Sequence, residues 1–339
     1  MSKTQSSTII KQIAVYVIIA LLIGGAIYSG NQKHFGWQQY LQLALDGLRG
    51  GTIYALVALG FVTVFNVTGI INFAQGGFAM LGAMIAVSIN DMERLAELSA
   101  APRLILAIIG AVALTTLIGI FIERVTIYPA RNSEPMTLII ITVGVYIAMQ
   151  GLALIIWGTD SYSLPSFTTL ELKDTTIRLG GIIIKAQSFW IWGTTIVVMA
   201  GLAYFFDRTM WGRALRACAV NKQAARLMGI SPNRMSVLSF AMAAALGAIG
   251  GIVLAPATRP VYDMGLVLGL KGFVAAIMGG LVNAPAAVLG GILLGMLENI
   301  GAGVTRAGIK DIFAFIILIL VLLFRPNGIL SREQPVEKV

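Results

Sequence analysis

Residues 207–235 read DRTMWGRALRACAVNKQAARLMGISPNRM, and they lie between two long apolar runs. Against a single acid, Asp207, the stretch holds six basic residues: Arg208, Arg213, Arg216, Lys222, Arg226 and Arg234. Short loops this rich in Lys and Arg stay on the cytoplasmic side of a membrane. Residues 221–229 are predicted to form a short helix that ends at Gly229, with Pro232 just beyond. A capped helix on the cytoplasmic side indicates a place where a partner docks.

The composition of the 339-residue chain is that of a membrane protein. Hydrophobic residues make up 58% of it and charged residues only 12%, whereas a soluble domain carries about 25% charged residues. The net charge of +9 lies in loops between apolar runs, which favours positive-inside topology over nucleic-acid binding. One cysteine, Cys218, and one histidine, His34, exclude a disulfide within the chain and any site that needs several of these residues. We therefore expect no catalytic residues, no metal site and no cofactor.

Ten apolar segments approach the bilayer-spanning length of ~20 residues. They cover residues 13–30, 42–65, 72–90, 104–122, 136–157, 188–206, 236–256, 266–282, 285–303 and 311–324. The fold class predicted is all-α, a polytopic transmembrane helical bundle of about ten spans. The first segment follows Lys3 and Lys11 and has no clear cleavage site, so a retained span is favoured over a signal peptide. Residues 1–36 are thus expected to form an N-terminal extension with an extra span.

The distribution of charge predicts the orientation of the chain. With Lys3 and Lys11 inside, ten spans place both termini and residues 207–235 in the cytoplasm. Most of the excess of basic residues then lies inside, as the positive-inside rule requires. The longest outside loop is 158–187, and its Thr, Ile and Gly content predicts a small strand-like or irregular cap.

Two apolar segments, 47–82 and 265–299, are interrupted by glycines and polar residues. Each contains a Phe-Val pair that is followed by an asparagine and a glycine-rich apolar run. The pattern indicates either a duplication of two halves or chance similarity between apolar sequences. Interrupted segments in both halves point to a transport site. Close helix packing is the favoured role of the recurring glycines, and the alternative is a broken helix that lines a cavity, at Gly69 and Gly279–Gly280. These glycines are Gly69, Gly76, Gly77, Gly82, Gly247, Gly250, Gly251, Gly279, Gly280, Gly290, Gly291 and Gly295.

Polar groups at membrane depth are costly unless they face protein or water. The candidates for lining a solute path are Asn66, Thr68, Asn72, Gln75, Lys271, Asn283 and Glu298. The amides serve either as interhelical hydrogen-bond partners or as the lining of the path. Lys271 and Glu298 each need a partner or water, because a charge near mid-membrane costs at least ~2.5–3.5 kcal/mol. Glu298 could also serve a proton-coupled secondary carrier, which stands as an alternative function.

The predicted cytoplasmic helix contains the stretch QAARLMG at 223–229. Its small residues would let it seat deeply in the groove of a partner, and its glycine suits a helix C-terminus. The alternative is a solvated helix that lies near anionic lipid headgroups. The chain holds no G-x-x-x-x-G-K-[ST] motif, so an ATPase, if ATP drives the protein, is another subunit.

These residues resemble a known family. Residues 223–229 are similar to the Glu-Ala-Ala-x-x-x-Gly coupling motif of ABC importer permeases, with Gln223 in the Glu position. Closer similarity, to the LivH family of branched-chain amino-acid permeases, lies in GRALRACA at 212–219, LMGI at 227–230, GIINFAQG at 69–76, TIYAL at 52–56, IERV at 122–125 and RPNGIL at 325–330. The similarity runs from about Trp37 to the C-terminus, and residues 1–36 extend beyond it.

The resemblance implies a permease domain at 37–339 that has its cytoplasmic coupling loop at 207–235. The coupling residues it implies are Gly212, Arg213, Arg216, Asn221, Gln223, Ala224, Ala225 and Gly229. It implies a bacterial inner-membrane importer of Leu, Ile and Val that is not itself an enzyme. Its partners would be a second homologous permease subunit, two cytoplasmic ABC ATPases and a periplasmic solute-binding protein. Import of urea or short-chain amides is the alternative within the same class.

Overall fold

The computed structural model describes residues 35–168, 176–179, 181–305, 308, 310–324 and 328. The predicted span at 13–30 and nearly all of the tail motif at 325–330 lie outside these residues. Among the described residues the bundle is made of α2 (Trp37–Thr68), α3 (Gln75–Asn90), α4 (Ala100–Ile122), α6 (Pro135–Trp157), α7 (Ala186–Arg208), α8 (Met210–Val220), α9 (Lys222–Leu227), α10 (Pro232–Thr258), α11 (Met264–Gly279), α12 (Ala284–Val304) and α13 (Lys310–Phe324). The shorter elements are the 3₁₀ turn η1 (Glu93–Leu95), the π-helical turn η2 (Glu123–Ile127) and α5 (Tyr128–Ala130).

The described residues contain six helices that are long and apolar enough to cross a membrane. These are α2, α4 with its continuation to Ala130, α6, α7, α10 and α12. Helices α3 and α11 are apolar but have only 16 residues each, about 24 Å at 1.5 Å per residue, which is short of the ~30 Å hydrocarbon core. The described residues therefore do not support the predicted count of about ten spans. The predicted span at 266–282 ends early because the left-handed Gly280 terminates α11, whereas α2 continues past the predicted end at residue 65 to Thr68, before the left-handed Gly69.

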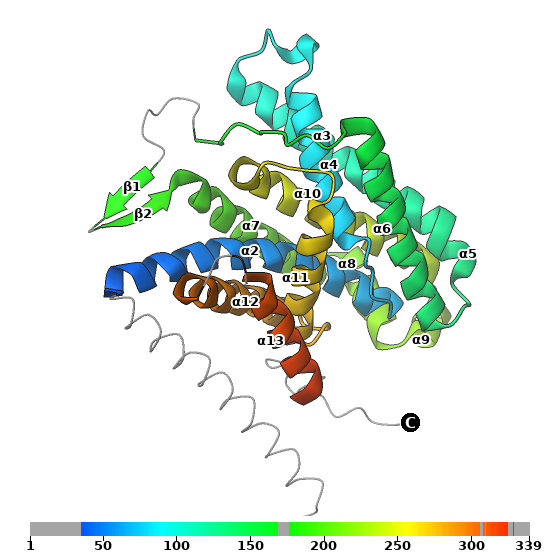
Figure 1. Ribbon diagram of the computed structural model, residues 1–339. Coiled ribbons are helices and arrows are strands. Elements are labelled where there is room, and N and C mark those ends of the chain that lie inside the picture. The colour runs from blue at the N-terminus through cyan, green and yellow to red at the C-terminus, as the bar shows by residue number, and fades with distance from the viewer. Residues whose placement is uncertain are drawn as a thin grey trace, which may run out of the picture.

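Helix α2 lies at the centre of the bundle, where it packs against α10, α11 and α12 (Figure 1). In an apolar stretch of 18 residues within α2, 83% of the residues are buried, whereas in the corresponding stretch of α7 only 11% are buried. A helix that is apolar all round and buried by its neighbours forms the core, whereas the exposed apolar faces of α4, α6 and α7 suit contact with lipid or with another subunit.

Glycines set how closely the central helices approach. Helices α2 and α12 meet through Gly51 and Gly291, and a Cβ at Gly51 would lie 2.6 Å from the carbonyl oxygen of Gly291. Gly47 and Gly295 make a similar contact one turn away. The prediction of close helix packing is confirmed at Gly291 and Gly295, where a side chain would separate the two backbones.

A small antiparallel hairpin covers the N-terminal end of α2. It consists of β1 (Thr176–Leu179) and β2 (Ile182–Lys185). Gln42 of α2 fixes β2 by donating to the Ile183 carbonyl (3.1 Å) and accepting from the Ile183 N–H (2.9 Å). The predicted strand-like cap within 158–187 is confirmed.

Candidate functional site

The first helix break joins α2 to α3 and carries two buried amides. Gly69 ends α2 with φ +74°, a backbone conformation that glycine adopts without strain. Asn72 and Gln75 follow, and both are fully buried. The Asn72 Oδ1 accepts from the Ala74 N–H (3.2 Å), and the Gln75 Nε2 donates to the Ala243 carbonyl of α10 (2.9 Å). Both side chains therefore lie inside the protein, where Asn72 bonds within the break and Gln75 ties it to α10.

The second break joins α11 to α12 and is more open. Gly280 ends α11 with φ +90°, and Leu281 follows with φ +59°. Asn283 is the N-cap of α12, where its Oδ1 accepts from the Ala286 N–H (3.4 Å). Asn283 and Val282 are exposed, unlike the amides of the first break. The structure therefore shows the alternative, a break in the helix, at Gly69 and at Gly280.

The two breaks are in direct contact. The partly buried Asn66 donates from Nδ2 to the Val282 carbonyl (3.0 Å). The Phe273 ring lies 5.1 Å from that of Phe73 and 5.7 Å from that of Phe61. A change at one break therefore reaches the other through a hydrogen bond and a shared aromatic cluster.

Two hollows open beside the breaks. One, of about 410 Å³, is lined by Asn66, Asn283 and residues of α7 and α8. The other, of about 460 Å³, reaches from Gly69 and Val282 to α8 and α9. Two of the residues predicted to line a solute path, Asn66 and Asn283, border these hollows. Thr68 borders a third hollow, of about 420 Å³. Asn72 and Gln75 border none of the three.

The coupling loop folds as two capped helices. Thr209 caps α8 by accepting from the Gly212 N–H (3.0 Å). Asn221 caps α9 by accepting from the N–H groups of Gln223 (2.9 Å) and Ala224 (3.0 Å). Gly229 closes α9 with φ +80°. Side-chain oxygens of Thr and Asn satisfy the free N–H groups of a first turn, so the helix predicted at 221–229 is confirmed.

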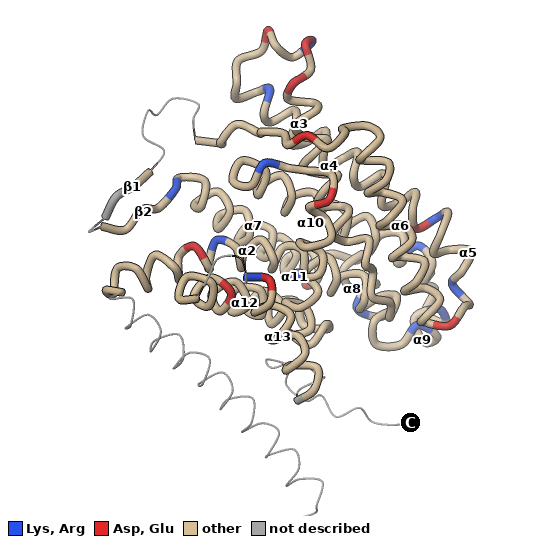
Figure 2. Tube along the Cα trace, in the orientation of Figure 1, with Lys and Arg blue, Asp and Glu red and all other residues tan. Residues whose placement is uncertain are grey.

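The basic residues of the coupling loop gather around α8 and α9, near α5 (Figure 2). Arg216 forms an ion pair with Asp207, and Arg213 contacts the sulfur of Met210. Gly212 sits against α7, where a Cβ would lie 2.6 Å from the Phe206 Cα. The close contact at Gly212 fixes the corner between α7 and α8.

Ala225 does not lie on the outer face of α9. Only 4% of it is exposed, and it packs with Val67 of α2, Leu215, Cys218 and Met235. The small residues of this helix were expected to seat in the groove of a partner, whereas the structure places Ala225 against the permease itself. The large apolar side chains exposed to solvent here are Val220 (89%), Leu227 (88%) and Met228 (82%), and Gln223 and Ala224 are among the other exposed residues.

Lys222 connects the coupling loop to the first break. Its Nζ donates to the Thr68 carbonyl (2.7 Å), in the last turn of α2, where the carbonyls have no partner within the helix. Burial lowers the pKa of Lys222. The sequence shows Lys222 only as one of six basic residues in a loop, and nothing in its spacing indicates a partner 154 residues away.

Lys271 and Glu298 form the centre of a buried charged cluster. The Lys271 Nζ lies 2.6 Å from Glu298 Oε1 and 2.6 Å from Asp311 Oδ1, and it donates to the Tyr54 hydroxyl (3.4 Å). Lys271 is 5% exposed and Glu298 is fully buried. The expectation that each needs a partner is confirmed, since a buried charge is tolerated when it is paired. Within the described part of the chain no group of three His, Cys, Asp or Glu is placed to hold a metal ion.

The sequence of the chain is similar to those of known permeases. Residues 43–322 match the family described as branched-chain amino acid transport system / permease component. The high-affinity branched-chain amino acid transport system permease protein BraD of Pseudomonas aeruginosa is 36% identical over 302 residues, which cover 88% of this chain and 98% of the relative. LivH of Escherichia coli K12 is 33% identical over 303 residues, with the same coverage. The ribose import permease protein RbsC of the same organism is 23% identical over 314 residues, 90% of each chain.

No solved structure gives a significant match to the chain. The family match covers far more than half of the sequence, and the two broken helices and the capped coupling helices lie within it. The chain belongs to the branched-chain amino acid transport system permease family.

Proposed function

We propose that this chain is the permease subunit of an ATP-driven importer and that its solutes are the branched-chain amino acids Leu, Ile and Val. The family match and the names of the relatives support the choice of solute. The partners proposed are a second homologous permease subunit, two cytoplasmic ABC ATPases and a periplasmic solute-binding protein. The protein lies in the bacterial inner membrane, with residues 207–235 and both termini in the cytoplasm.

The observation that best supports this mechanism is the hydrogen bond from Lys222 to the Thr68 carbonyl. It joins the coupling loop to the end of the most buried helix, at the residue before Gly69. A displacement of α9 therefore acts directly on the first break, and the Asn66–Val282 bond carries it to the second. An ATPase that moves α9 would thereby change the hollows beside both breaks.

The ATPase is proposed to bind the exposed side of α9. Val220, Leu227 and Met228 give this side an apolar surface, and basic residues of the same loop lie along α8 and α9 (Figure 2). The buried Ala225 supports the helix from below because it packs on Val67. The exposed residues of α9 are thus proposed to contact the ATPase, and the buried Ala225 to hold α9 against the permease.

Uptake measurements test the function. A strain without branched-chain amino acid uptake would express this chain with its partner subunits, and entry of labelled leucine would be followed. We expect uptake that needs the ATPases, is inhibited by Ile and Val, and survives dissipation of the proton gradient while ATP is maintained. Competition by urea or acetamide but not by Ile would support the amide alternative. Uptake that follows the proton gradient alone would support a secondary carrier.

Substitutions on α9 test the docking surface. Leu227→Asp and Met228→Asp should abolish co-purification of the ATPase while leaving the permease abundant in the membrane. Met92→Asp is the matched control, since Met92 is also an exposed methionine (50%) but lies between α3 and η1. Ala225→Trp should lower the abundance of the permease itself, because overpacking an interior position costs about 1–3 kcal/mol. Normal ATPase binding by both aspartate variants would contradict the proposed surface.

A further inference from the structure

A cavity at the other end of α2 has polar groups that the proposed coupling mechanism does not use. It measures about 290 Å³ and lies between α2, the C-terminal end of α10, α11, α12 and α13. Arg49 on its wall stands about five helical turns from Thr68, on the order of 28 Å along the axis. The cavity is therefore close to the membrane face opposite the coupling helices.

The walls of this cavity carry more positive than negative charge. Its basic lining residues are Arg49, Arg259, Lys271 and Lys310. Lys271 is neutralised by Glu298 and Asp311, and Lys310 lies 3.8 Å from the same Glu298. Within the described residues no ion pair involves Arg259, whose side chain is exposed. The unneutralised guanidinium can bind a carboxylate with two parallel hydrogen bonds.

The backbone of Arg259 is strained. Its φ of +54° and ψ of +97° follow the end of α10, and only one other described non-glycine residue, Leu281, has a positive φ. Such conformations cost about 1–3 kcal/mol and gather at ligand sites, where the surrounding structure holds them. The strained residue is thus one that lines the cavity, as expected if the cavity is a ligand site.

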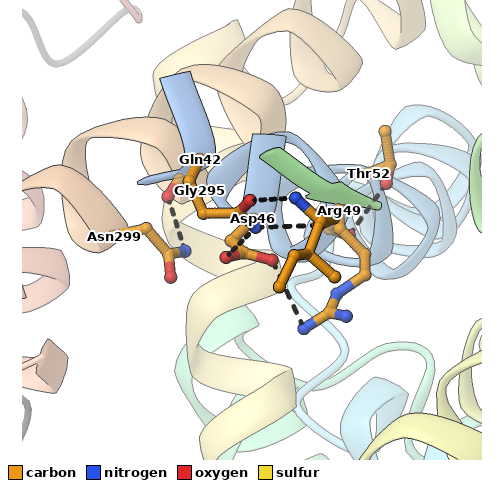
Figure 3. A network of polar contacts seen from close by, with 7 residues as sticks. Gln42, Asp46, Arg49, Thr52, Gly295 and Asn299 are labelled. Carbon is orange, nitrogen blue, oxygen red and sulfur yellow. Dashed lines mark hydrogen bonds and ion pairs between the residues drawn. The ribbon is translucent and has the colours of Figure 1, made fainter. Parts of the chain in front are cut away.

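Asp46 supplies a negative group in the same cavity. Figure 3 shows it on α2 between Gln42 and Arg49, with Asn299 of α12 nearby. Its Oδ2 accepts from the Gln42 Nε2 (3.0 Å), and its Oδ1 forms an ion pair with Arg49 at 3.9 Å, a separation too long for a hydrogen bond. The side chain is 40% exposed. The Oδ1 can therefore still accept a hydrogen bond from an ammonium group.

Apolar side chains complete the lining. Ile53 and Leu268 are nearly buried (3% and 6% exposed), and Val267 is 45% exposed. The volume of about 290 Å³ is close to the lower end of the range of ligand pockets. An aliphatic side chain would remove these groups from water, which favours binding roughly in proportion to the apolar area covered.

We propose that this cavity binds a zwitterionic aliphatic amino acid. Arg259 binds its α-carboxylate, Asp46 accepts from its α-ammonium, and Ile53, Val267 and Leu268 surround its side chain. The choice of solute rests on the proposed function. The site would receive the amino acid at the face opposite α9, before the helix breaks let it pass.

Direct binding tests the assignment. Labelled leucine would be titrated into the purified complex of both permease subunits and the ATPases, without the solute-binding protein, and uptake would be measured in parallel. Arg259→Gln and Asp46→Asn should each weaken leucine binding about tenfold or more, since a hydrogen bond to a charged group contributes that much. Val267→Trp should fill the cavity and abolish binding. Arg94→Gln and Leu266→Trp are matched controls outside the cavity, and both should bind leucine normally.

Leucine analogues separate direct binding by Arg259 and Asp46 from a purely structural role, because a structural role would not change the preference for leucine over an analogue. Leucinol lacks the carboxylate, and 4-methylpentanoate lacks the ammonium group. Arg259→Gln should lose the preference for leucine over leucinol, and Asp46→Asn the preference over 4-methylpentanoate. Unchanged affinity and preference in both variants, with normal leucine uptake by the wild type, would overturn the cavity assignment alone. Absence of leucine binding and uptake in the wild type would overturn the proposed function and the cavity assignment together.

Discussion

The two helix breaks have the same glycine geometry and opposite surroundings. Both begin at a left-handed glycine, Gly69 or Gly280, and both are followed by an asparagine whose side-chain oxygen accepts from a backbone N–H two or three residues later. The Asn72 of the first break is fully buried, whereas the Asn283 of the second is exposed. The first break is also the one that the coupling loop touches. We infer that the first break receives the motion and that the second borders the solute path.

The largest expected effect is that of Gln75→Leu in the first break. The change removes the hydrogen bond to the Ala243 carbonyl and places methyl groups against Gly60, where the Gln75 side chain already leaves no room for a Cβ. We expect a loss of about 1–3 kcal/mol in stability and a severe loss of uptake, measured by thermal unfolding in detergent and by leucine entry. Asn283→Leu, at the exposed break, should lower the unfolding temperature much less. Equal losses in the two variants would contradict the difference between the breaks.

Lys222→Met should have the next largest effect. It removes a charge-assisted hydrogen bond to Thr68, which is worth about 1.5–3 kcal/mol and thus about tenfold or more in coupling. We expect ATP hydrolysis to continue while leucine uptake falls. Arg208→Met is the matched control, because Arg208 is exposed in the same loop. Tight coupling in Lys222→Met would show that the contact with α2 carries no motion.

The pH dependence of coupling follows from the same residue. Burial lowers the pKa of Lys222, so its charge is present below that lowered pKa and is lost as the pH rises through it. Uptake per ATP hydrolysed should therefore fall at alkaline pH in the wild type and stay level in Lys222→Arg. In this window the unfolded chain binds more protons than the folded one, so Lys222 makes stability rise with pH. A fall of coupling without a fall in unfolding temperature is the expected pattern.

Asn66→Leu should have a moderate effect, since it removes the single side-chain hydrogen bond between the breaks that we describe, the one to the Val282 carbonyl. The bond is partly exposed, and we expect uptake to fall about threefold with normal abundance in the membrane. Leucine uptake and co-purification of the ATPase would be measured together. An unchanged rate would mean that the aromatic contacts alone connect the two breaks.

The smallest effect on the protein is expected from single cysteine substitutions, whose rates of labelling compare the exposure of the two breaks. Cys218 is 1% exposed, and burial raises the pKa of its thiol, so it should react slowly. In a Cys218→Ala background, Val282→Cys should react with an impermeant maleimide in inside-out vesicles, because Val282 is 61% exposed. Asn72→Cys should react far more slowly. Labelling of Val282→Cys in intact spheroplasts would instead reverse the proposed orientation.

Local features of this fold could be predicted from the sequence. Gly69, Gly229 and the glycine pair at Gly279–Gly280 marked the ends of helices, and Asn221 marked the start of one, because each acts on its own backbone. The sequence also predicted that Lys271 and Glu298 need partners, because both are charged within apolar segments. It could not identify Asp311 as a partner of Lys271.

Contacts between distant elements could not be predicted. Ala225 faces inward because α9 lies on Val67 and Met235, and a six-residue helix has too few turns for periodicity to reveal its buried side. Likewise, the contact of Lys222 with Thr68 depends on the position of α9 relative to α2. The described residues support fewer spans than predicted, and one reason is that a hydropathy average does not show where a glycine such as Gly280 ends an apolar helix after 16 residues.

The buried pair of Lys271 and Glu298 also bears on biogenesis. Helix α11 leaves the translocon with a lysine among only 16 residues, and a lysine at the centre of a span opposes insertion by ~2.5–3.5 kcal/mol. Its counter-charge is synthesised 27 residues later, on α12. We therefore expect α11 and α12 to enter the bilayer together as a hairpin whose charges cancel, so that a chain arrested before Glu298 would be recognised by membrane proteases as incomplete.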